Sequence, residues 1–86
     1  MGKVTTICFS SRDAWFYSND HLPYHFHLAK PGKWEIRVYF LKSFENMFEI
    51  KYGKGPSGRE KKTIFRMVDP VRENLLREWE GKVSCM

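Results

Sequence analysis

The chain has 86 residues, of which 42% are hydrophobic, and its formal net charge at pH 7 is +5. That length supports one modest hydrophobic core and excludes two, so we expect a single domain over residues 1–86. No apolar run approaches the roughly 20 residues of a membrane-spanning helix, and the N-terminal residues lack the apolar segment of a signal peptide, so we expect a soluble, cytoplasmic protein.

Alternating apolar and polar residues predict a sheet in the first part of the chain. We expect strands at residues 4–10, 15–17, 24–28, 34–40 and 47–52, separated by turns rich in Ser, Asp, Pro and Gly. In residues 34–40 the alternation places Trp34, Ile36, Val38 and Phe40 on one face and Glu35, Arg37 and Tyr39 on the other. Consecutive strands are expected to pair as hairpins, which makes the sheet mostly antiparallel.

The glycine-rich residues 53–56 end the predicted sheet. Ser57 and Glu60 have the spacing of a capping box, which predicts a helix that runs to about Val68 with Ile64, Phe65 and Val68 facing inward.

A second helix is predicted from Asp69 as N-cap and Pro70 in the first turn, and Gly81 is expected to end it. Its expected inward residues are Val71, Leu75, Leu76 and Trp79. We therefore expect an α+β fold, with a mostly antiparallel sheet of four or five strands followed by two C-terminal helices packed on one face.

Tryptophan and cysteine positions give further predictions. Trp15, Trp34 and Trp79 each fall on an expected apolar face, so we expect all three in the core. Cys8 lies in a predicted strand and is expected to be a small buried residue, whereas Cys85 is expected to be a thiol in the tail. The pair fits neither a disulfide framework nor a C-x-x-C metal site, although a bridge between the two stays open.

All three histidines, His21, His25 and His27, lie within seven residues. Pro23 favours an extended chain, and alternation along the following strand places His25 and His27 on one face, with Phe26 on the other. Three interpretations stay open. The histidines can be structural, His25 and His27 with His21 or Asp20 can bind a zinc-like ion, or His25 and His27 can act as acid and base on an RNA phosphodiester.

Residues 17–28, with the sequence YSNDHLPYHFHL, resemble the signature of a small bacterial family known as domain of unknown function forty-one sixty. The matching residues are Tyr17, Asn19, Asp20, His21, Pro23, His25, Phe26 and His27, whereas Tyr24 stands where the family usually has a second proline. The segment from Gly58 to Trp79 also resembles the family's closing helices. The resemblance implies a small protein of the kind often encoded in toxin and antitoxin style gene pairs.

The positive charge is concentrated in one window. Its six basic residues are Lys51, Lys54, Arg59, Lys61, Lys62 and Arg66. Glu60 is the single acid among them, so the window carries the whole excess of +5. A glycine-rich loop before a helix start favours an anion, and Tyr24 and Tyr52 are candidates to stack on bases. The loop lacks the Walker spacing, and solvation of a helix surface is the alternative reading.

These patterns predict a small non-enzymatic binding protein of the regulator or antitoxin type. We expect it to contact nucleic acid or a partner protein, and no membrane, through the basic window together with Tyr24, His25, His27 and Arg37. No cofactor is expected, with zinc as the alternative. The alternative functions are a metal-dependent or histidine-based ribonuclease and a protein inhibitor of a larger nucleic-acid enzyme. An unpaired edge strand is another means of recruiting a second chain.

Overall fold

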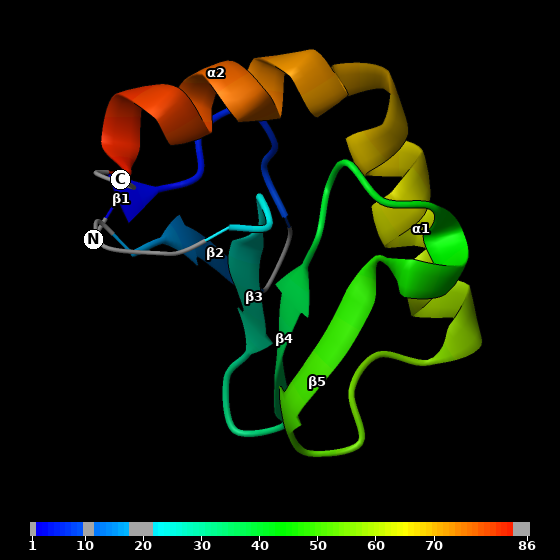
Figure 1. Ribbon diagram of the computed structural model, residues 1–86. Coiled ribbons are helices and arrows are strands. Elements are labelled where there is room, and N and C mark those ends of the chain that lie inside the picture. The colour runs from blue at the N-terminus through cyan, green and yellow to red at the C-terminus, as the bar shows by residue number, and fades with distance from the viewer. Residues whose placement is uncertain (1, 10–11, 18–21, 84–86) are drawn as a thin grey trace.

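A computed structural model describes residues 2–9, 12–17 and 22–83. In this part of the chain five strands form one antiparallel sheet in which each strand pairs with the next (Figure 1). The strands are β1 (Gly2–Lys3), β2 (Asp13–Phe16), β3 (Phe26–Lys30), β4 (Trp34–Val38) and β5 (Phe48–Tyr52), and a short 3-10 helix, η1 (Phe44–Asn46), precedes β5.

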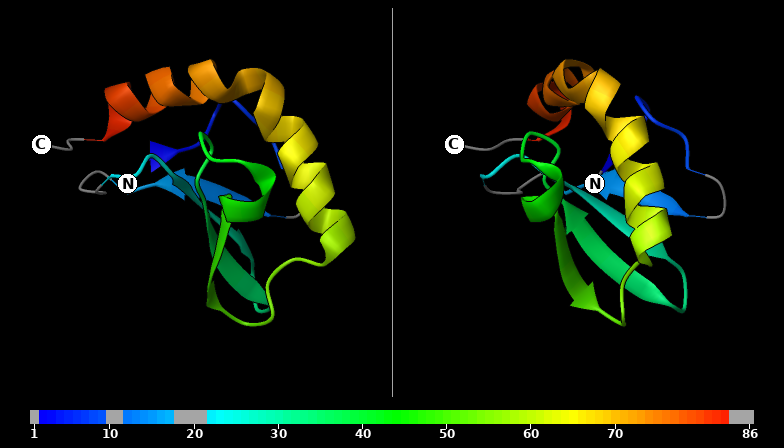
Figure 2. Two further views of the ribbon diagram at one scale, coloured as in Figure 1. Left: turned by 45° about the vertical axis from the view of Figure 1, so that its right-hand side comes forward. Right: turned by 90° about the vertical axis from the view of Figure 1, so that its right-hand side faces the viewer.

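One bent helical run follows the sheet. It consists of α1 (Gly58–Val68), the 3-10 turn η2 (Asp69–Val71) and α2 (Arg72–Lys82). Figure 2 shows the run arching over one side of the sheet. The predicted α+β fold is confirmed, although the two predicted helices are joined through η2. None of the described helices is long and apolar enough to cross a membrane.

The core lies between the helical run and one face of the sheet. Alternation along the strands supplies the fully buried Phe16, Phe26, Leu28, Ile36 and Val38 from the sheet. The helices supply Ile64, Val68, Leu75 and Trp79. Each fully buried large apolar side chain contributes roughly 1.5–3 kcal/mol to folding, so this face-to-helix contact is the main source of stability.

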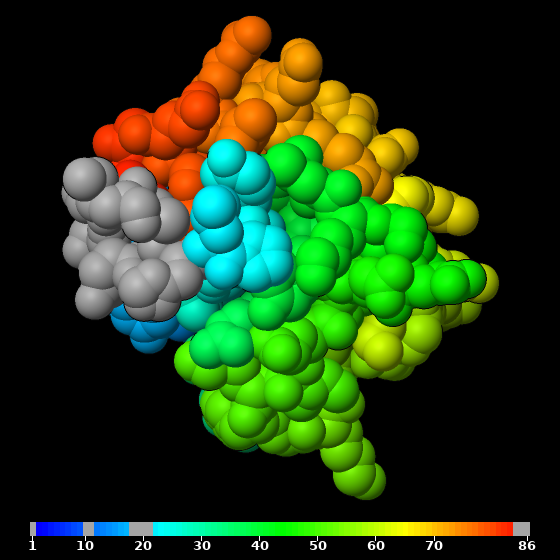
Figure 3. Space-filling model, viewed as in Figure 1, coloured from blue at the N-terminus to red at the C-terminus, as the bar shows by residue number. Residues whose placement is uncertain are grey.

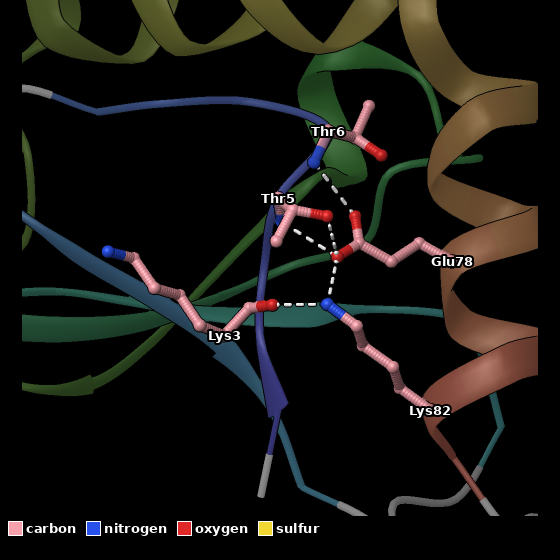
Figure 4. A network of polar contacts seen from close by, with 5 residues as sticks. All are labelled: Lys3, Thr5, Thr6, Glu78 and Lys82. Carbon is pink, nitrogen blue, oxygen red and sulfur yellow. Dashed lines mark hydrogen bonds and ion pairs between the residues drawn. The ribbon is translucent and has the colours of Figure 1, made fainter.

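The first strand, predicted at residues 4–10, is wrong, because β1 is Gly2–Lys3 and the backbone pairing with β2 continues only to the Val4 amide, which donates to the Ala14 carbonyl at 3.0 Å. The next two residues, Thr5 and Thr6, donate their backbone amides to the carboxylate of Glu78 on α2, at 2.7 and 2.9 Å. Figure 4 shows both amides turned toward that carboxylate. The contact with α2 therefore replaces strand pairing beyond Val4.

Two expected core residues are not in the core. Trp15 lies between Ala14 and Phe16, which both face the helices, so alternation turns Trp15 to the opposite face of the sheet. Cys8 is exposed, because the segment that holds it is not a core strand. Cys85 lies outside the described residues. Trp34 and Trp79 are buried as predicted.

The predicted ends of the second helix are also wrong. Asp69 has helical dihedral angles and is the C-cap of α1, where its amide donates to the Phe65 carbonyl, and its carboxylate accepts from Arg72 Nε at 3.0 Å instead of capping a new helix. Gly81 does not end α2, which continues to Lys82, because the Val83 amide still donates to the Trp79 carbonyl at 2.8 Å. The Lys82 ammonium also bonds to both Glu78 (2.5 Å) and the Lys3 carbonyl (2.6 Å).

Gly53 is required by the turn after β5. Its φ is +77°, and a Cβ there would lie 2.3 Å from the carbonyl oxygen of Lys33. We expect Gly53→Ala to lower the free energy of unfolding by about 2 kcal/mol or more, from left-handed strain plus this clash. Gly32 is the matched control, since it has the same φ and no described atom within 4 Å, so Gly32→Ala should cost about 1 kcal/mol. Equal losses in urea unfolding would contradict the clash.

Candidate functional site

The start of α1 forms the predicted capping box. Ser57 Oγ accepts from the Glu60 amide at 3.1 Å, and a Glu60 carboxylate oxygen accepts from the Ser57 amide at 3.2 Å. The other Glu60 oxygen accepts from Arg12, and these contacts, the one with Arg12 above all, lower the pKa of Glu60. The start of α1, where the sequence predicts an anion site, therefore already holds the carboxylate of Glu60.

Further along α1, Arg59, Lys62 and Arg66 are three and four residues apart, which places them on one side of the helix. All three are exposed. Within the described ranges none of them forms an ion pair with an acidic side chain. Together with Gly58 and Thr63 they line a shallow, open hollow of about 430 Å³. We call Arg59, Lys62 and Arg66 the cationic face.

The other basic residues of the window are placed differently. The Lys51 ammonium lies 3.4 Å from the Glu35 carboxylate, and the Lys61 ammonium lies 5.9 Å from the centre of the Phe48 ring. Lys54 is exposed in the turn after β5. The structure thus separates three cations that share one helix face from three that do not.

The predicted histidines belong to an aromatic cluster on the sheet face that the helices leave open, and at the edge of this cluster the His25 ring also lies against α2, 5.6 Å from the Trp79 ring. We call Trp15, Tyr17, His25, His27 and Tyr39 the histidine face. The His27 ring stacks on Trp15 with centroids 5.6 Å apart and meets Tyr17 edge-on at 4.5 Å. The His25 ring lies 5.0 Å from His27 and 5.4 Å from Tyr39. The predicted placement of His25 and His27 on one face is confirmed.

Both histidines are buried. His25 is 6% exposed and His27 is 2% exposed, and His25 Nδ1 lies 2.7 Å from the carbonyl oxygen of Pro23. Ring stacking and a backbone contact are what a structural histidine makes, so the geometry favours that interpretation. Little of either ring is therefore open to a metal ion or a phosphodiester in this structure.

The zinc interpretation needs a third ligand. Among the described residues, no three His, Cys, Asp or Glu side chains are grouped in a way that could hold a metal ion. His21 and Asp20, the third ligands that we considered, lie outside the described residues.

A charged network continues the open sheet face from the histidine face toward β5. Arg37 Nη1 and the Tyr39 hydroxyl both donate to one Glu49 oxygen, each at 2.7 Å. The bonds from Tyr39 and Arg37 lower the pKa of Glu49, and the bond to Glu49 raises the pKa of Arg37. Burial, followed by the bond to Glu49, raises the pKa of Tyr39. The positive charge of Arg37 is therefore already paired with the carboxylate of Glu49 in the same chain.

The structure does not bring the predicted binding residues together. The cationic face is on the helical layer, whereas His25, His27 and Arg37 point from the other side of the sheet. Tyr24 is half-buried beneath α2, with its ring 5.4 Å from Trp79. The sequence leaves open whether the basic window and the histidines adjoin, and the structure places the cationic face and the histidines on separate surfaces.

Sequence reasoning missed two charged side chains that join distant segments. Arg12 bonds Glu60 across 48 positions of sequence, and Glu78 binds the Thr5 hydroxyl at 2.8 Å as well as the amides already described (Figure 4). The spacing of Glu78 and Lys82 by four residues indicates an ion pair, but nothing local indicates its partners at the N-terminus.

Comparison with known proteins identifies a family. A family model described as domain of unknown function DUF4160 matches residues 14–80, from β2 into the last turns of α2. No curated protein and no solved structure matches the chain. The match spans well over half of the chain and confirms the predicted family. The chain belongs to the DUF4160 family of domains of unknown function.

Proposed function

We propose that the chain is a small non-enzymatic binding protein of the regulator or antitoxin type that contacts nucleic acid through the cationic face of α1. The observation that supports this proposal is the alignment of Arg59, Lys62 and Arg66 on one exposed helix face without acidic partners among the described residues. The regulator or antitoxin part is supported by the family resemblance alone.

The spacing of these cations suits a phosphate backbone. An α-helix rises about 1.5 Å per residue, so the seven positions from Arg59 to Arg66 cover about 10 Å. Each strand of a B-form DNA duplex carries one phosphate about every 3.4 Å of the duplex axis, so if α1 lies along that axis its three cations face roughly three phosphates of one strand. Such contacts position a protein on nucleic acid without reading its bases, so we expect binding to depend little on sequence.

The proposal is tested by removing the charge of this face. We expect the triple variant Arg59→Gln, Lys62→Gln, Arg66→Gln to bind labelled duplex or single-stranded RNA about tenfold or more weakly, because three phosphate contacts are lost. The slope of log K against log salt should become shallower by about 3 between about 50 and about 200 mM salt. Fluorescence anisotropy measures both quantities.

A matched control separates this face from net charge. Lys33, Lys42 and Arg77 are exposed cations elsewhere, and their triple replacement by glutamine changes the net charge equally. This variant should keep the wild-type salt slope. The proposal fails if both variants lose affinity equally, or if the wild-type protein binds no nucleic acid at low salt.

A further inference from the structure

β5 is an edge strand. In the part of the chain that the structure describes, it pairs with β4 alone and is the last strand of the sheet. The Tyr39 amide donates to the Met47 carbonyl at 2.7 Å, so the backbone groups of Met47, and by alternation those of Glu49, face β4. The backbone groups of Phe48 and Ile50 therefore point outward, where an added strand would bond to them.

The side chains of β5 are also exposed. Ile50 is 46% exposed and Tyr52 is 48% exposed, which is unusual for large apolar residues on a strand. Figure 3 shows this part of the chain at the front surface of the molecule, below α2. Exposed apolar residues on an open strand edge are the features that lead to pairing between chains.

We propose that β5 pairs antiparallel with β5 of a second copy of this chain, with the two-fold axis at Ile50. In this register Ile50 lies opposite itself, and Glu49 of each copy lies opposite Lys51 of the other. Directly opposite side chains in an antiparallel pair have Cβ atoms about 4.5–5.5 Å apart, which is close enough for an ion pair.

Charge complementarity favours a second copy as the occupant and this register over those centred on Glu49 or Lys51. Within one chain Arg37 bonds Glu49 at 2.7 Å, and Lys51 lies 3.4 Å from Glu35. Pairing about Ile50 joins these two ion pairs into a row of alternating positive and negative side chains that crosses β4 and β5 of both copies. The row reads Arg37 and Glu49 of one copy, then Lys51 and Glu35 of the other. A register centred on Glu49 or on Lys51 would instead place that residue opposite its own charge.

A β-bulge limits the size of the contact. Ile36 lies opposite Ile50 and Glu35 opposite Tyr52, so the register of β4 and β5 shifts at Lys51. Two five-residue strands with a bulge at one end form a small interface, so the dimer is expected to be reversible and to depend on concentration. The dimer is independent of nucleic-acid binding, because no residue of the cationic face belongs to β5.

Complementary charge variants test the pairing. Lys51→Glu places two carboxylates opposite each other at both contacts, and Glu49→Lys places two ammonium groups there, so both variants should self-associate at least about tenfold more weakly than the wild type. An equimolar mixture of the two restores opposite charges at the contacts between unlike copies, so it should form a heterodimer that is clearly tighter than the self-association of either variant. It should be weaker than the wild-type dimer, because each altered residue meets a like charge of β4 in its own chain. Sedimentation equilibrium over a wide concentration range measures all three.

The control is Lys54→Glu, which makes the same charge change just outside β5 and should leave association unchanged. Circular dichroism confirms that each variant is folded. The proposal is overturned if the wild-type chain stays monomeric at every concentration. It is also overturned if the single variants associate as tightly as the wild type, or if their mixture stays monomeric.

Discussion

Replacing Trp79 with alanine is expected to lower the free energy of unfolding by about 3–5 kcal/mol, the usual cost of removing a large aromatic side chain from a core. Trp79 is 3% exposed, and its ring lies 6.0 Å from Phe16 and 5.4 Å from Tyr24. It therefore joins α2 to the sheet. In a domain of this size a loss of about 3 kcal/mol lowers the melting temperature by more than about 12 °C, which calorimetry detects directly.

Trp15 supplies the matched control, because it is a half-buried tryptophan on the opposite sheet face. We expect Trp15→Ala to cost about 1–2 kcal/mol, since less apolar surface is removed from the interior. If the two variants were equally unstable, the core would not lie on the helical side of the sheet.

Glu78→Gln is expected to lower the free energy of unfolding by about 2–3 kcal/mol at pH 7. Burial alone would raise the pKa of Glu78, but hydrogen bonds from Lys82, Thr6 and Thr5 outweigh it and lower the pKa to about 2. Glutamine keeps the size of the side chain and loses the charge that these donors face. Urea unfolding at neutral pH measures the loss.

The same pKa shift predicts how the loss changes with pH. The folded pKa of Glu78 lies below its ordinary value of 4.5, so the ionised carboxylate stabilises the native state. This stabilisation is complete above about pH 5 and fades as the pH falls through about 2, where the protonated acid resembles glutamine. The difference in the free energy of unfolding between wild type and variant should therefore disappear in acid. The exposed Glu80, replaced by glutamine, should change stability by less than about 0.5 kcal/mol at either pH, and a Glu78 gap that persists in acid would contradict the account.

Local patterns predicted most of the sheet and both helices. Alternation located β3 and β4 and assigned Phe26, Ile36 and Val38 to the buried face, because the two-residue period of a strand is a property of the backbone itself. The capping box of Ser57 and Glu60 located the start of α1, because its two partners are only three residues apart and the pattern is therefore visible in the sequence.

Contacts between distant segments explain what the sequence did not predict. The end of β1 depends on Glu78, which is 73 positions from Thr5, and no periodicity within residues 4–10 reports that contact. Among the predicted binding residues, counting charges located the basic window. It could not show that Lys51 faces Glu35 across a hairpin, or that the histidines lie on the other side of the sheet from α1.

The central claim is that nucleic acid contacts the cationic face of α1, and an NMR titration with a short RNA duplex tests it most directly. We expect the largest amide shifts at Arg59, Lys62 and Arg66, with little change at His25 and His27, because the two sets lie on opposite layers. Shifts concentrated at the two histidines, with α1 unmoved, would contradict the claim and make the histidine face the binding surface.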